Sequence, residues 1–175
     1  GRSGSTMQRL CRFSGCKIEM GSDKRVVEIR GASAGRALAR LCIDILLQQR
    51  NGGRLDCDWA AIEKRDDATT IDVPIAAVGF LMGSKGATLR DLESRHSVFM
   101  FFDNDTVRNR EKRLYVLGTG SARADAAEEC GRAIELKMSG NGQRVPSWQD
   151  YRAMQGEGGG GGGGDARRRD ERERE

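Results

Sequence analysis

Val78-Gly79-Phe80-Leu81-Met82-Gly83-Ser84-Lys85-Gly86-Ala87-Thr88-Leu89 is the stretch of sequence that decides the fold. It places an apolar run directly before two glycines that are separated by two polar residues. Leu89 and Leu92 follow the second glycine at three and six positions, so both lie on one face of a helix that begins there. The stretch therefore predicts two short helices joined by a glycine turn, where glycine tolerates backbone angles that other residues avoid.

The glycine pattern occurs a second time, at the start of the chain. Gly1-Arg2-Ser3-Gly4 is followed by apolar residues three and six positions after its second glycine, namely Met7 and Leu10. Self-similarity of this kind indicates two copies of one supersecondary unit.

Each predicted helix is followed by a strand, a polar loop, a second strand and a long helix. The strands are identified by alternating apolar residues or β-branched and aromatic content, and the long helices by an apolar stripe. The strand, strand and helix ranges are 14–20, 25–31 and 33–49 in the first copy and 97–102, 113–118 and 121–138 in the second. The second copy is five residues longer, mainly because the polar loop 103–112 replaces the short loop 21–24.

The second copy resembles the KH (K-homology) family. Its residues follow the family signature V-G-x-apolar-apolar-G-x-x-G-x-x-apolar, and a predicted strand that ends at Pro74 precedes them. The resemblance implies an α+β fold of type I, βααββα, with a three-stranded antiparallel sheet packed on three helices. Tandem modules of this type are similar to the poly(C)-binding, Nova and heterogeneous nuclear ribonucleoprotein K group.

We predict four regions along the chain. Residues 1–50 are a truncated KH module that lacks the first strand and first helix, and we expect sequence upstream of Gly1. Residues 51–67 are a linker with a short helix around 59–62, and residues 68–138 are a complete module. Residues 139–175 are a low-complexity tail that we expect to be mostly disordered, although Trp148 and Tyr151 offer an alternative in which 143–154 packs on the second module.

The resemblance implies that about four unpaired nucleotides lie across a narrow groove, clamped by the glycine turn. Free N–H groups at the start of the following helix and the charge of Lys85 favour a phosphate there. For the groove floor we predict Val78, Gly79, Leu81 and Leu89 with Phe99 or Phe101, while a role as ordinary core residues is the alternative for each. Base contacts are predicted for polar side chains near the variable loop. The predicted RNA-binding residues are Gly83, Ser84, Lys85, Gly86, Val78, Gly79, Leu81, Leu89, Phe99, Phe101, Arg108, Arg110, Lys112, Gly1, Arg2, Ser3 and Gly4.

The residue inventory argues against an enzyme and predicts no cofactor and no metal. His96 is the one histidine, and the five cysteines are scattered without a CxxC pair. Before Glu157 the chain carries 25 cations against 20 anions, a mild excess that suits a polyanionic partner. We expect an RNA-binding protein of the nucleus or cytoplasm that recognises short single-stranded RNA, regulates mRNA after transcription and associates with other ribonucleoprotein components. Single-stranded DNA binding and a KH-based protein scaffold are the alternatives, and no membrane partner is expected.

Overall fold

The computed structural model describes residues 4–23, 25–52, 54–108, 110–140 and 146–156 of the 175-residue chain. The chain forms two compact units, residues 1–145 and residues 146–175. The first unit contains both copies of the repeat. Among the described residues, no helix is both long enough and apolar enough to cross a membrane.

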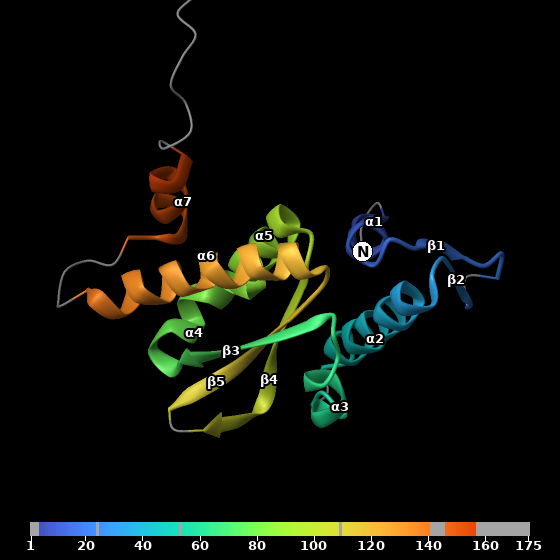
Figure 1. The fold of residues 1–175 in the computed structure, drawn as a ribbon, viewed down its shortest axis with the longest axis horizontal. Coiled ribbons are helices and arrows are strands. Elements are labelled where there is room, and N and C mark those ends of the chain that lie inside the picture. The colour runs from blue at the N-terminus through green and yellow to red at the C-terminus, as the bar shows by residue number, and fades with distance from the viewer. Residues whose placement is uncertain (1–3, 24, 53, 109, 141–145, 157–175) are drawn as a thin grey trace, which may run out of the picture. The chain divides into compact units, whose positions relative to one another are not determined.

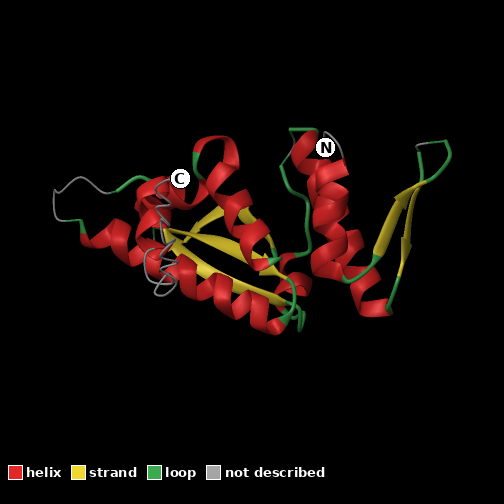
Figure 2. Ribbon diagram, turned by 90° about the horizontal axis from the view of Figure 1, so that it is seen from above, coloured by secondary structure: helices red, strands yellow, loops and turns green. Residues whose placement is uncertain are grey.

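The first copy consists of two helices and a hairpin. Its elements are α1 (Ser5–Ser14), β1 (Lys17–Met20), β2 (Val27–Arg30) and α2 (Ser33–Arg50). The two strands pair antiparallel, with Ile18 opposite Ile29, and the hairpin projects from the end of the helices (Figure 2). Leu10, Phe13 and Ile45 form part of the buried core.

One face of this first copy is open. Among the described residues β2 pairs with β1 and with no third strand. Met20, Val27 and Leu47 are exposed, and a hollow of about 890 Å³ lies between α1, the hairpin and α2. That residues 1–50 are a truncated module stays a prediction, and the structure shows an apolar surface on this copy that no described residue covers.

The second copy has two layers, helices on one face of a sheet. Its elements are β3 (Ala68–Pro74), α4 (Ile75–Met82), a 3₁₀ turn (Ser84–Gly86), α5 (Ala87–His96), β4 (Phe99–Arg108), β5 (Glu111–Leu117) and α6 (Gly120–Ser139). The antiparallel sheet has the order β3-β5-β4, with β5 in the centre. Helices α4, α5 and α6 cover one face of this sheet (Figure 1). The order βααββα and the three-stranded sheet confirm the predicted type I KH fold.

The other face of the sheet is covered by the linker and the first copy. Trp59 of α3 (Trp59–Glu63) packs on Tyr115, with ring centroids 5.2 Å apart, and Phe13 of α1 stacks on Phe99 at 5.9 Å. The hydroxyl of Tyr115 donates to Glu63 Oε1 at 3.0 Å, which ties α3 to β5. The short helix predicted around 59–62 is therefore confirmed, and it packs on the sheet.

The predicted variable loop 103–112 is mostly strand. β4 continues to Arg108 and β5 begins at Glu111, with a register shift between Phe102 and Val107. The chain reverses at Arg110, which has a φ of 67°. Strand pairing uses backbone groups, so a polar sequence can extend the hairpin. Such a sequence lacks the apolar alternation from which a strand is predicted.

The second unit contains helix α7 (Trp148–Gly156). Within it the rings of Trp148 and Tyr151 stack with centroids 5.0 Å apart, and Ser147 Oγ donates to Asp150 Oδ2 at 2.7 Å. Disorder is expected from the sequence for most of this stretch, whereas the structure has a helix that Ser147 and Asp150 cap through reciprocal hydrogen bonds. The rest of the predicted tail after Gly156 lies outside the described residues.

Candidate nucleic-acid interface

The turn between α4 and α5 requires both of its glycines. Gly83 has φ 68° and ψ 178°, and a Cβ at this position would lie 2.2 Å from Thr88 Oγ1. Gly86 has φ 77°, in the left-handed region, and Lys85 between them has φ 51°. The two glycines therefore maintain a backbone path that residues with a Cβ adopt only with strain.

This turn presents a positive surface for an anion. Ser84 and Lys85 are exposed, and α5 begins without a hydrogen bond from a capping side chain. The first N–H groups of an uncapped helix and the helix dipole favour negative charge. The guanidinium of Arg90 donates to the carbonyl of Lys85. A second cation therefore holds the backbone of the turn by a hydrogen bond.

A groove of about 230 Å³ opens beside the turn. One side is formed by Met82, Gly86 and Leu89, and the other by residues 99–102 of the edge strand β4 together with Lys112. Apolar side chains and the cations Arg90 and Lys112 thus line one groove, a combination that suits bases together with a phosphate backbone.

The four floor residues predicted on the helices differ in their exposure. Leu89 is half-buried and lines the groove, and Val78 is half-buried on α4. Gly79 is exposed on the same helix, where a Cβ would meet no other atom within 4 Å. Leu81 is fully buried in the core.

Phe99 and Phe101 present their rings to the core. Phe99 stacks on Phe13, while Phe101 stacks on Tyr115 with centroids 5.3 Å apart. Both side chains are only 1% exposed. The rings therefore pack in the core, because the linker helix and α1 cover that face of the sheet, while both residues also belong to the lining of the groove.

The predicted polar contacts lie at the end of the β4–β5 hairpin. Lys112 lines the groove, and Arg110 is exposed in the turn. Arg108 is the last residue of β4, opposite Glu111 in the strand register. In the first copy, Gly4 has φ 73° and precedes α1, whereas Gly1, Arg2 and Ser3 lie outside the described residues.

Sequence reasoning missed two charged residues in the groove, Glu93 and Arg9. Glu93 is only 2% exposed, and its Oε1 accepts a hydrogen bond from the backbone N–H of Met100 at 2.9 Å. Arg9 Nη1 lies 2.9 Å from Glu93 Oε2. A signal for Glu93 exists in the sequence, since it follows Leu89 by four residues and therefore shares its helix face.

Burial raises the pKa of Glu93 to about 6, against the opposing effects of the Arg9 charge and the Met100 hydrogen bond. A carboxylate in this position keeps its charge at neutral pH, held by a cation from another part of the chain.

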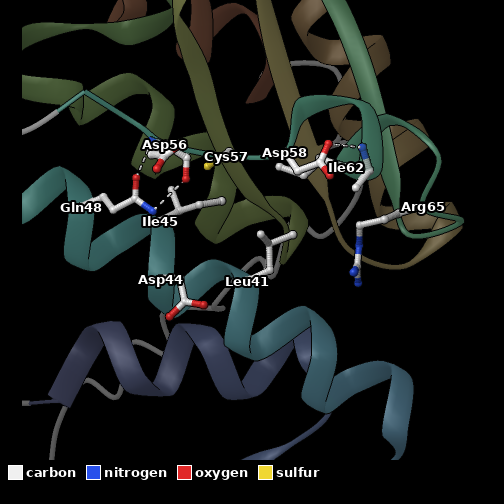
Figure 3. A pocket seen from close by; sticks show the side chains of 10 residues that line it. Leu41, Asp44, Ile45, Gln48, Asp56, Cys57, Asp58, Ile62 and Arg65 are labelled. Carbon is white, nitrogen blue, oxygen red and sulfur yellow. Dashed lines mark hydrogen bonds between the residues drawn. The ribbon is translucent and has the colours of Figure 1, made fainter.

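A second cavity, of about 270 Å³, lies between α2, the linker and α3 (Figure 3). Asp44, Asp56 and Asp58 line it, and Gln48 fixes the linker by accepting from the backbone N–H of Asp56 at 2.6 Å. Among the described residues no group of three or more His, Cys, Asp or Glu side chains is arranged to hold a metal ion. Three acids disfavour a phosphate backbone, so the groove beside the glycine turn is the better interface.

The fold and the turn define an α+β module of order βααββα with a glycine turn between its first two helices. The family model of the KH domain matches residues 1–44 and 68–131, more than half of the chain. The chain therefore belongs to the KH domain family, with two segments that each match its model.

The chain is similar to "Far upstream element-binding protein 2" of Homo sapiens and of Rattus norvegicus. It is 26% identical to each over 127 residues, which is 67% of this chain and 18% of each relative. The chain thus spans less than a fifth of the length of the curated relatives that it matches.

Two solved structures of Dim2p from Pyrococcus horikoshii OT3 are also similar. The first is 17% identical with a TM-score of 0.34, and the alignment covers 89% of each chain. The second, a complex described as a/eIF2alpha-aDim2p-rRNA, is 17% identical with a TM-score of 0.35, covering 90% of this chain and 84% of that one.

Proposed function

We propose that this chain binds short single-stranded RNA in the groove of residues 68–138, with the turn Gly83-Ser84-Lys85-Gly86 clamping the RNA backbone. The observation that carries the proposal is the position of that turn, at the uncapped start of α5 and beside a groove that Gly86, Leu89 and Lys112 line. Membership of the KH domain family supports the same conclusion.

The chemistry divides between the turn and the groove. A phosphate lies against the N–H groups at the start of α5 and near the Lys85 ammonium, where charge and hydrogen bonding act together. Bases lie on the apolar surface of Met82 and Leu89, because unpaired bases lose water-exposed area there. Neither step makes or breaks a covalent bond, so the proposed activity is binding.

The proposed role is in post-transcriptional regulation of mRNA, as part of a ribonucleoprotein. Within that role the groove supplies recognition of a short unpaired sequence. Binding should weaken with salt along a shallow slope, because few phosphates are neutralised.

A double substitution in the turn tests the proposal. Ser84→Asp with Lys85→Asp places two anions where a phosphate must lie, so we expect loss of measurable RNA affinity with the fold intact. Ser22→Asp with Lys17→Asp is the matched control, since it makes the same two changes at exposed positions of the first hairpin. Fluorescence anisotropy with a short random-sequence RNA at fixed salt gives the affinities, and circular dichroism checks the fold.

Equal affinity of the turn variant and the control would overturn the proposed clamp. A DNA oligonucleotide of the same sequence separates RNA binding from binding of any single strand. Selection from a random RNA pool provides a second test, since a short unpaired motif should be enriched by the unaltered chain and lost in the turn variant. If no sequence is enriched, the protein-scaffold alternative becomes the better explanation.

A further inference from the structure

The groove of the second module is completed by residues of the first copy. Arg9 of α1 and Leu46 and Gln49 of α2 line the same groove as Gly86 and Leu89. A ligand that fills the groove therefore contacts both copies of the repeat.

Arg9 and Glu93 form a charged pair at this shared wall. Their side chains are 20% and 3% exposed, and Nη1 of Arg9 lies 2.9 Å from Oε2 of Glu93. The other carboxylate oxygen accepts from the Met100 N–H, so Glu93 is fixed between α1 and the edge strand. The carboxylate is thereby held in one orientation before any ligand enters.

One N–H donor of the Arg9 guanidinium makes no hydrogen bond to the described residues. Its Nε is buried and has no hydrogen-bond partner among the residues that the structure describes. A buried donor without a partner carries a free-energy cost that a hydrogen bond relieves. A small rotation of the guanidinium toward an acceptor on an incoming ligand therefore gains a hydrogen bond.

We propose that Arg9 and Glu93 together read the edge of one base in the groove, so that the first copy contributes to sequence preference in the second. This inference rests on the proposed RNA binding. A carboxylate accepts from the exocyclic amino group of a base, and a guanidinium donates to the ring nitrogen or carbonyl oxygen beside it. The volume of about 230 Å³ lies just below the usual range of small-ligand pockets, ~300–1,000 Å³, which suits a single base.

The pair selects for cytidine over uridine. Cytosine offers an amino donor next to two acceptors, which matches one carboxylate oxygen and the guanidinium. Uracil presents a carbonyl oxygen in place of the amino group, and this oxygen faces the Glu93 carboxylate without a shared hydrogen. Like partial charges at that point disfavour uridine.

The test compares Arg9→Lys and Glu93→Gln with Arg12→Lys as the matched control, since Arg12 is exposed on the same helix. Lysine keeps the charge beside Glu93 and so preserves the fold, but it lacks the planar set of donors. Fluorescence anisotropy measures the affinity of the full chain for two RNA decamers that differ only in four central positions, cytidine in one and uridine in the other.

We expect the unaltered chain to prefer the cytidine decamer by about tenfold, the discrimination typical of one well-formed base contact. Arg9→Lys should lower affinity for the cytidine decamer by about the same factor and leave the uridine decamer nearly unchanged. Glu93→Gln should reduce the preference for cytidine by raising the affinity for the uridine decamer, because its amide N–H₂ can donate to the uracil oxygen. Arg12→Lys should behave as the unaltered chain.

Retention of the full cytidine preference by both Arg9→Lys and Glu93→Gln would overturn this inference while leaving RNA binding in place. Equal affinity of the unaltered chain for the two decamers would also overturn this inference and leave RNA binding in place. Failure of the unaltered chain to bind either decamer would instead overturn the proposed function on which the inference rests.

Discussion

The two copies of the repeat share a helix, a hairpin and a long helix, yet among the described residues only the second has a three-stranded sheet. In the second copy β5 is paired on both sides, and Val73 of β3 and Leu81 of α4 are fully buried. In the first copy the corresponding side of β2 and α2 is open, with Val27 and Leu47 exposed. In the second copy β3 and α4 cover this side, while the hairpin is a local feature that both copies have.

The two copies also contribute differently to the groove. The second holds the groove, and the first supplies a side wall through Arg9 and covers the back of the sheet through Phe13. The first copy therefore packs on its neighbour through both residues.

The largest expected difference concerns independent folding. We predict that residues 68–138, produced alone, unfold in one cooperative thermal transition, whereas residues 1–50 alone show none. The reason is that too little apolar surface is buried in the shorter segment to offset its conformational entropy. Circular dichroism during heating measures both, and a sigmoidal transition of residues 1–50 would contradict the distinction.

Substitution of one glycine in each copy, the first of the pattern in the second copy and the last in the first copy, should give the next largest difference. Gly83→Ala adds a Cβ 2.2 Å from Thr88 Oγ1 at a backbone conformation that suits only glycine, so we expect a loss of about 3 kcal/mol or more in the free energy of unfolding. Gly4 has φ 73° and ψ 7°, in the left-handed helical region, and an added Cβ meets no atom within 4 Å, so Gly4→Ala should cost about 1 kcal/mol. Urea denaturation of the two variants gives both values, and equal losses would contradict the extra cost expected from the Gly83 conformation together with crowding at Thr88.

A third difference follows from the groove acid, because the first copy has Cys11 where the second has Glu93, seven residues after the glycine turn. The pKa of Glu93 is raised to about 6 from an ordinary value of 4.5 by burial, so the folded chain binds its proton more tightly than the unfolded chain does. Its contribution to stability is therefore fully present below pH 4.5 and is lost as the pH rises through about 6. The shift corresponds to about 2 kcal/mol.

The measurement is the free energy of unfolding of the unaltered chain and of Glu93→Gln at several values between pH 4 and pH 7.5. The difference between the two chains isolates Glu93 from the other titrating groups. It should change by about 2 kcal/mol across this window and stay level above it. A constant difference would contradict the raised pKa.

Local sequence patterns were sufficient to predict the module order, the glycine turn and most strand and helix positions. Each of these depends on residues within one element, as for the apolar spacing of Leu89 and Leu92. The core role of the Phe99 and Phe101 rings was left open because Trp59 and Phe13 reach them from distant parts of the chain. The Arg9–Glu93 contact was missed for the same reason, since it joins residues 84 positions apart that no local period connects.

The smallest expected effect concerns the exposed strand β2 of the first copy, compared with the buried central strand β5 of the second. Val27 and Leu114 both stand four residues before the glycine that ends the second strand, but Val27 is 38% exposed and Leu114 is fully buried. Val27→Thr keeps the branched shape and should change the free energy of unfolding by less than about 0.5 kcal/mol, whereas Leu114→Ala should cost about 2–5 kcal/mol through the cavity that it leaves. Urea denaturation of the full chain measures both. A large loss for Val27→Thr would mean that the open face of the first copy is covered in solution, and the two copies would then be more alike than their strand pairing indicates.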